Sequence, residues 1–373
     1  MARFRTVEDG FFGCILFRIR RPGFRAISNL FLKGECIMKN VTKLVLVGLV
    51  CLSMLLLSFS PAMAVKKIRT GTVALPETTL HQALVKWQSV LQEKSKGELA
   101  VTILDRGVMG GDREMIEACR LGTLDSAVVS GSVLSNLVPQ FFMIPLPYLF
   151  NDHAEVNAYL DGPFGAKLFG MLEPKDLVGL GWATWSFRGV WNNVRPIVKP
   201  DDIKGLKIRT VETPLDMSTM NSMGGVATPM SWNECLLGLR QGTVDGISTT
   251  YGLGYALKLY DISKYATQTK HYYETAPLIM SKKFFDKFTP QEQKLIKESA
   301  AEALRWARME QAAVDEASAP LLEKKGVKVN TIPKETFEVF RQRTRPVYTQ
   351  FVDKIGKQFM DDSMAFIEKN RKK

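Results

Sequence analysis

Hydrophobic residues in the first third of the chain switch repeatedly between the two-residue period of a strand and the spacing of a helix. The predicted elements are, in order, a strand at 67–73, a helix at 80–91, a strand at 99–104, a helix at 112–121 and a strand at 125–129. Asp112, after Gly110 and Gly111, is expected to be the N-cap of the second helix. This order predicts a mostly parallel sheet covered by helices.

The same order returns in the middle of the chain. Strand-like runs are expected at 177–183, 182–187 and 206–211, helices at 214–223 and 233–239, and a further strand at 272–281. The chain is therefore predicted to form two similar α/β lobes.

Two long helical patterns follow. Thr289, Pro290 and Glu292 form a capping box with proline at the first helical position, and the helix is expected to run to about Ser318. Its length of roughly 40 Å would be enough to lie across both lobes. More helix is expected at 336–369, with a break near Pro346.

The first 64 residues are predicted to be absent from the mature protein. Residues 38–64 combine a basic start, an apolar run of 16 residues and an Ala-Met-Ala end, which is typical of a cleaved secretory signal peptide. A membrane anchor is the alternative, but the run is short for one. Residues 1–37 precede this signal and are interpreted as an upstream segment that is not translated, with Met38 as the start.

Charge and cysteine content limit the function classes. The net charge of +12 falls to +6 without residues 1–64, and the remaining charge is spread along the chain. That distribution does not indicate a nucleic-acid partner, although it favours the approach of anions. Cys119 and Cys235 are the cysteines left after residue 64. Both lie in apolar segments predicted to be helical, which favours two buried thiols over a disulfide.

Arg188 and Arg209 are the most informative candidates for chemistry. Each follows or ends an apolar, strand-like run, and a segment rich in Pro, Asn and Asp separates them. A guanidinium is a planar fork of donors that can pair at two points with a carboxylate or a sulfonate. Ordinary surface ion pairs are the alternative interpretation.

Motifs of catalysis and metal binding are absent from the sequence. It contains no G-x-S-x-G, P-loop or G-x-G-x-x-G motif, and no cluster of cysteine and histidine with metal-ligand spacing. Asp245, between Val244 and Gly246, is interpreted as a turn residue rather than an acid or base. An enzyme is thus the weaker hypothesis, and no cofactor is expected.

Several motifs together carry a family resemblance. They are GGDREM at 110–115 with Cys119 and Asp125 beyond it, LPY at 146–148, GLKIR at 205–209, TPM at 228–230 with Trp232 and Glu234, and GLRQGTVDG at 238–246. In this order the chain, from Lys67 to its C terminus, resembles the extracytoplasmic solute-binding proteins of TRAP transporters, of the DctP type.

The resemblance implies a two-lobed periplasmic binding protein fold. Two mixed sheets flanked by helices would be joined by a hinge and by a long helix that spans both domains. The first domain would comprise residues 65–186 and 275–314, and the second 187–274 and 315–373.

The resemblance also implies a ligand site. Arg209 matches the arginine that holds the ligand carboxylate, and Arg188 matches a second arginine at the same site. Trp232 matches an aromatic position that packs on the ligand. The remaining candidates are Glu212, Thr249, Trp185, Tyr251 and Asp112. Trp185 or Tyr251 is expected to extend the aromatic wall, and Glu212 to orient Arg209 or to bind a ligand hydroxyl. Glu212 and Thr249 replace the asparagines of sialic-acid-binding members, which argues against that ligand.

The function implied is capture of a small organic acid, a carboxylate or a sulfonate, in the cleft between the domains. The protein would work in the periplasm of a Gram-negative bacterium and deliver its ligand to the small and large membrane subunits of a TRAP permease. The alternatives are a binding protein that serves a sensor system and a secreted enzyme on a similar scaffold.

Overall fold

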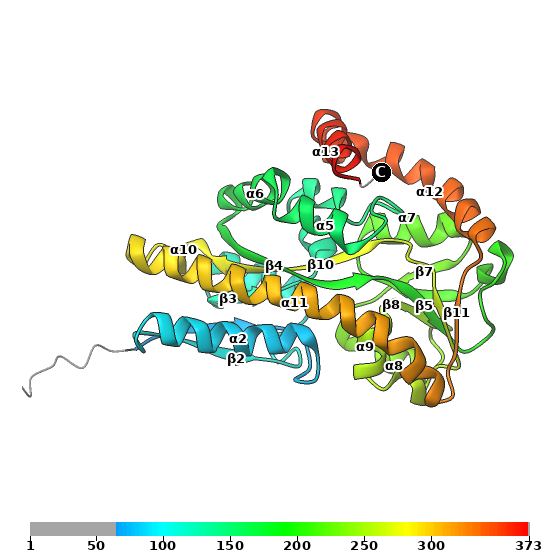
Figure 1. Cartoon of the computed structure of the whole chain (residues 1–373), viewed down its shortest axis with the longest axis horizontal. Helices are drawn as coiled ribbons and strands as arrows, with labels where there is room; N and C mark the ends of the chain where they lie inside the picture. The colour runs from blue at the N-terminus through cyan, green and yellow to red at the C-terminus, as the bar shows by residue number, and fades with distance from the viewer. Residues whose placement is uncertain (1–64, 372–373) are drawn as a thin grey trace, which may run out of the picture. The chain divides into compact units, whose positions relative to one another are not determined.

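The computed structural model of the chain describes residues 65–371. The predicted upstream segment and signal peptide lie outside the described residues. Within 65–371 the chain forms two β-sheets with helices packed against both (Figure 1). None of the helices in this range combines the length and the apolar composition that crossing a membrane requires.

Both sheets are mixed, as predicted. The first has the strand order β2-β1-β3-β10-β4, and the second β11-β9-β5-β8-β6-β7. The strands are β1 (Lys66–Gly71), β2 (Leu99–Leu104), β3 (Ser126–Val128), β4 (Leu177–Phe187), β5 (Gly189–Asn192), β6 (Lys207–Thr210), β7 (Val226–Pro229), β8 (Gly246–Thr249), β9 (Tyr265–Gln268), β10 (Tyr273–Ser281) and β11 (Lys328–Thr331). In the first sheet β1 is parallel to β2 and β3, whereas β10 runs antiparallel to β3 and β4. In the second, β6 is parallel to β7 and β8, and β5 is antiparallel to β8 and β9.

The helices alternate with these strands in both halves of the chain, as the sequence pattern predicted. The α-helices are α2 (Thr79–Lys94), α3 (Asp112–Leu121), α4 (Gly131–Leu134), α5 (His153–Leu160), α6 (Pro163–Gly170), α7 (Pro214–Met223), α8 (Trp232–Arg240), α9 (Tyr251–Ala256), α10 (Lys282–Phe285), α11 (Pro290–Lys324), α12 (Lys334–Ile355) and α13 (Lys357–Asn370). Short 3-10 helices lie at Pro139–Met143, Glu173–Lys175, Pro200–Ile203 and Leu259–Asp261.

The predicted N-cap of α3 was wrong. Gly111 occupies that position, and its backbone N–H donates to Oε2 of Glu114 at 2.8 Å. Asp112 is instead the first helical residue, and its Oδ1 accepts a hydrogen bond from the backbone N–H of Ser130 at 2.9 Å. The carboxylate of Asp112 therefore points to the loop before α4 and not to its own helix.

Helix α11 connects the two halves. Its capping box is formed as predicted, because Thr289 accepts from the backbone of Glu292 and Glu292 accepts from the backbone of Thr289. The helix continues six residues beyond the predicted end at Ser318 and contains 35 residues. It packs on α2 and β4 of the first half and on α9 and β11 of the second, as Figure 1 shows. The prediction of a long helix that contacts both lobes is confirmed.

The predicted helix break at Pro346 was wrong. Helix α12 runs through Pro346 without interruption, because Val347 and Phe351, one and five residues later, are buried in the core. This burial offsets the hydrogen bond that proline removes. The break comes at Gly356, whose φ of 89° lies in the left-handed region that glycine tolerates.

Two short segments carry the chain between the sheets. Only Arg188 separates β4 of the first sheet from β5 of the second, and residues 269–272 connect β9 back to β10. The two crossings are hydrogen-bonded, since the backbone N–H of Arg188 donates to Tyr272 at 3.0 Å and that of His271 donates to Arg188 at 3.3 Å. Arg188 thus lies on the line about which the two lobes would hinge. The domain boundaries given above stay a prediction.

Cys119 and Cys235 are both buried and both free, as expected.

Arg308 on α11 offers a test of how this helix is held. Its side chain is buried and donates to the side chains of Asn157 and Asp161 and to the backbone carbonyl of Trp182. We expect Arg308→Met to lower the free energy of unfolding by about 3 kcal/mol, because the buried carbonyl of Trp182 and the partly buried side chains of Asn157 and Asp161 lose their donor. Urea titration measures this.

Arg305→Met is the matched control. Arg305 pairs with the same Asp161 at 3.5 Å, but its side chain is 60% exposed. Its loss should cost no more than about 1 kcal/mol. Equal losses in the two variants would contradict the role given to Arg308.

Candidate functional site

Residues from the two halves of the fold enclose a small cavity of about 20 Å³, which has room for roughly one water molecule. It is lined by Val73, Asp112, Ser130, Trp185, Arg188, Arg209, Val211, Trp232 and Leu253. The first four come from the half of the first sheet, the last four from the half of the second, and Arg188 from the crossing between them. A ligand in this position would therefore contact both lobes.

Five of the eight predicted site residues line this cavity, and three do not. Tyr251 is buried beside Trp191, and its hydroxyl donates to the carbonyls of Ala266 and Asn330, each at 3.0 Å. These contacts place it in the core of the second lobe, and of the predicted aromatic residues only Trp185 and Trp232 line the cavity.

Glu212 and Thr249 also lie outside the lining. No hydrogen bond or ion pair in the described range joins Glu212 to Arg209, and the backbone carbonyl of Glu212 accepts from Asn136 at 3.3 Å. The role expected of Glu212, which was to orient Arg209 or to bind a ligand hydroxyl, stays a prediction. Thr249 is fully buried at the end of β8, opposite Gly189 of β5.

Arg209 on β6 is a buried cation with a free donor. Its side chain is only 3% exposed, and its Nε donates to the carbonyl of Met230 at 2.9 Å. Its Nη1 has no partner among the described residues. The ring of Trp232 lies 5.4 Å from its Cζ. Burial and the like charge of Arg188 lower the pKa of Arg209, although Cys235, Tyr272 and Asp112 oppose this shift.

Arg188, by contrast, is already engaged. Its Nη1 donates to the carbonyl of Ser248 at 2.6 Å, and its Nη2 lies 3.4 Å from Oε2 of Glu274. The ring of Tyr272 is 5.6 Å from its Cζ. Although burial opposes the charged form, these neighbours raise the pKa of Arg188. Only Nε is left without a partner within the described range.

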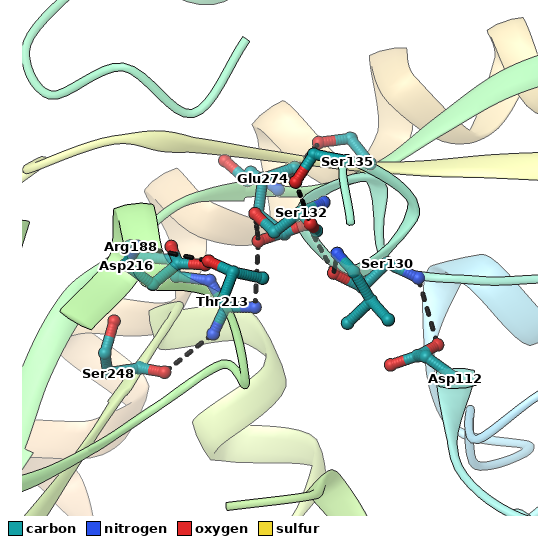
Figure 2. Close-up of polar contacts among 12 residues, drawn as sticks. Asp112, Ser130, Ser132, Ser135, Arg188, Thr213, Asp216, Ser248 and Glu274 are labelled. Atoms are coloured by element: carbon teal, nitrogen blue, oxygen red, sulfur yellow. Dashed lines mark hydrogen bonds and ion pairs between the residues drawn. The ribbon is translucent and has the colours of Figure 1, made fainter. Parts of the chain in front are cut away.

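Glu274 on β10 is a component of this site that the sequence reasoning missed. Figure 2 shows its carboxylate between Arg188 and two serines of the α4 segment. Ser130 donates to it at 2.9 Å, and Ser132 donates through its hydroxyl at 2.8 Å and its backbone at 3.2 Å. Glu274 is the one acidic residue in β10, all of which is buried, and this pattern could have revealed it.

Two further buried carboxyl groups surround the arginines. Burial and the charge of Glu274 raise the pKa of Asp112 to about 6, against the hydrogen bond from Ser130. Burial and the same charge raise the pKa of Asp216, on α7, to about 7. Asp216 was also missed, because Thr213 and Asp216 have the spacing of an ordinary helix cap and do form one. The site is therefore crowded with acidic groups.

A larger groove of about 540 Å³ lies elsewhere, between α6, β4 and α11. Its buried cation is Arg308, whose three donor nitrogens are already bonded within the protein. None of the side chains that line this groove has a buried polar atom without a partner. In residues 65–371 no group of acidic, histidine or cysteine side chains is placed to hold a metal ion. The cavity at Arg209 is the better candidate site.

Comparison with known proteins assigns the family. The model named DctP, described as bacterial extracellular solute-binding protein, family 7, matches residues 70–355. The chain belongs to this family. The resemblance seen in the sequence motifs is thereby confirmed.

Relatives of this solute-binding protein support the assignment. A solute-binding protein of Verminephrobacter eiseniae is 33% identical over 283 residues, which are 74% of this chain and 83% of the relative. The 2,3-diketo-L-gulonate-binding periplasmic protein of Escherichia coli is 30% identical over 247 residues, 66% of this chain and 75% of the relative.

A crystal structure shares the fold. It is that of the sugar acid binding protein of Advenella mimigardefordensis in complex with galactonate, with a TM-score of 0.80 and 28% identity. The match covers 82% of this chain and 99% of that one. The two-lobed fold with two mixed sheets is thus that of the TRAP solute-binding proteins.

The raised pKa of Asp112 predicts a pH effect on the stability of the ligand-free protein. Below pH 3.8 the carboxyl of Asp112 is neutral in both the folded and the unfolded protein. As the pH rises from there through about 6, the unfolded protein loses this proton first, so the free energy of unfolding falls. Asp112→Asn keeps an acceptor for Ser130 and removes the charge. Between pH 4.5 and 7.5 the variant should gain about 2 kcal/mol of stability relative to the natural protein.

Urea titrations of the two proteins across this pH range measure the effect. A stability difference that does not change with pH would contradict the burial of a charged Asp112.

Proposed function

We propose that this protein is the periplasmic solute-binding subunit of a TRAP transporter, which captures a small organic acid by its anionic group at Arg209. The observation that carries the proposal is the buried, unpaired Nη1 of Arg209 at a cavity lined from both lobes. A buried guanidinium stabilises a carboxylate strongly because neither group is hydrated there. A sulfonate presents similar oxygens and belongs to the same ligand class. The relatives that bind galactonate and 2,3-diketo-L-gulonate support an organic acid.

Binding and closure are coupled in this proposal. The cavity of about 20 Å³ is too small to admit an organic acid as it stands, so the lobes part for entry. An acid that contacts Arg209 and Trp232 from one lobe and Asp112 from the other gains most in the closed form, and this difference drives closure. The small and large permease subunits would then receive the closed, loaded protein.

Substitution of Arg209 tests the anchor. We expect Arg209→Lys to weaken binding of an organic acid at least about tenfold, because an ammonium group cannot reproduce the two-point geometry of the guanidinium. Arg209→Ala should abolish it. Thermal-shift screening of residues 65–373 against carboxylates and sulfonates identifies the acid, and calorimetry gives its affinity.

Arg195→Ala is the control for this test. Its side chain donates only to the carbonyls of Asp202 and Lys204, outside the cavity, so the affinity should stay unchanged. Equal affinity in Arg209→Lys and the natural protein would show that Arg209 is not the anchor.

A binding protein should return its ligand unaltered. We expect the acid found in the screen to be recovered quantitatively after long incubation with the natural protein. Asp245→Asn should behave identically, because Asp245 accepts a bond from the backbone of Lys207 at 2.8 Å and has the structural role predicted for it. Mass spectrometry of the recovered acid is the readout. Conversion by the natural protein that Asp245→Asn abolishes would favour the enzyme hypothesis.

A further inference from the structure

We infer that Glu274 makes this site selective for acids with one carboxylate over acids with two. The inference rests on the proposed function and specifies its ligand class. It starts from a contrast between two buried arginines at one cavity. Arg188 has an acidic partner built into the protein, and Arg209 has none among the described residues.

The partner of Arg188 is fixed in place. Three hydrogen bonds from Ser130 and Ser132, of 2.8–3.2 Å, hold both carboxylate oxygens of Glu274. The side chain is fully buried, so no water competes for it. Its distance of 3.4 Å from Arg188 is long for a hydrogen bond, but an opposite charge at this range acts strongly in a dry interior. Glu274 therefore offsets the charge of Arg188 whether or not a ligand is bound.

The charge balance of the site disfavours a second anionic group. Arg188 and Arg209 supply two positive charges, and Glu274 offsets one of them. His271 adds no charge, since burial lowers its pKa to about 3. The other carboxyl groups close to the arginines are those of Asp112 and Asp216, whose pKa values of about 6 and about 7 leave them largely ionised at pH 7.5. A second ligand carboxylate would therefore find no positive charge left to balance it.

The free donors match one carboxylate as well. Among the described residues Arg209 is bonded only through Nε, which leaves its two Nη groups for the two oxygens of one carboxylate, and Arg188 retains only Nε. The rest of the lining consists of the apolar or aromatic side chains of five residues and the polar groups of Asp112 and Ser130. These five residues are Val73, Trp185, Val211, Trp232 and Leu253. A second carboxylate would meet apolar side chains or Asp112 and would be buried without a counter-ion.

Two pairs of acids with equal carbon chains provide the test. 2-Hydroxybutyrate and malate differ by one carboxylate, and so do galactonate and galactarate. Calorimetry at pH 7.5 should show the natural protein binding the monocarboxylate of a pair at least about tenfold more tightly. This ratio is measured without any variant and needs no assumption about folding.

Glu274→Gln tests the residue itself. The amide keeps acceptors and donors for the two serines and removes the charge. The ratio of monocarboxylate to dicarboxylate affinity should fall at least about tenfold, because Arg188 becomes available to a second carboxylate. Glu155→Gln is the matched control, since Glu155 is also buried and also paired with an arginine, Arg371 at 3.2 Å, but lies outside the cavity. Its ratio should equal that of the natural protein.

The outcomes separate this inference from the proposed function. Equal or tighter binding of the dicarboxylates by the natural protein overturns the inference and leaves the proposed function intact. A ratio that is the same in Glu274→Gln and Glu155→Gln overturns the role of Glu274. Absence of any hit in the screen of carboxylates and sulfonates, or binding that persists in Arg209→Ala, counts against the proposed function itself.

Discussion

The burial of two like charges at one cavity is the constraint on which the rest of the site depends. Arg188 and Arg209 are only 5% and 3% exposed, and a guanidinium without water or a partner is costly. The protein compensates these charges unequally. Arg188 is paired with Glu274 and with a backbone carbonyl, whereas Arg209 is bonded to a single backbone carbonyl. In the proposed function, a ligand carboxylate would pair with the donors of Arg209 that the fold leaves unpaired. Part of the free energy of binding would therefore come from relieving the unpaired charge that destabilises the ligand-free protein.

Arg188 is both a buried charge of the site and part of the connection between the two lobes. It is the only residue between β4 and β5, and its backbone is bonded to the return crossing at Tyr272 and His271. Near the two crossings, Ser186 in β4 and Lys270 between β9 and β10 have φ values of 80° and 46°, which residues other than glycine adopt at a cost. A change in the angle between the lobes must displace a charged group of the site. In the proposed function, ligand binding and hinge motion would therefore involve the same residue.

Local signals in the sequence were sufficient for most of the fold. Strand β2 begins and ends where the alternation predicted, and α3 covers the predicted residues, because these patterns are resolved within a few positions of the chain. The prediction of a break at Pro346 was wrong because the loss of a helix hydrogen bond is visible in the local sequence, whereas the compensating burial of Val347 and Phe351 depends on distant elements. The site was predictable where family motifs marked a residue, as at Arg209. Glu274 was missed because its partners lie 86 or more positions away.

The aromatic residues and the charged residues of the site are suited to select different properties of a ligand. Trp185 and Trp232 reach the cavity, and Tyr251 uses its hydroxyl to bond two carbonyls in the core of the second lobe. Aromatic walls limit the size of a ligand but respond weakly to its charge. Under the inference drawn above, the charge of the ligand is selected instead by fixed charged groups, because a buried carboxylate such as Glu274 opposes an additional anion more strongly than a change of shape does.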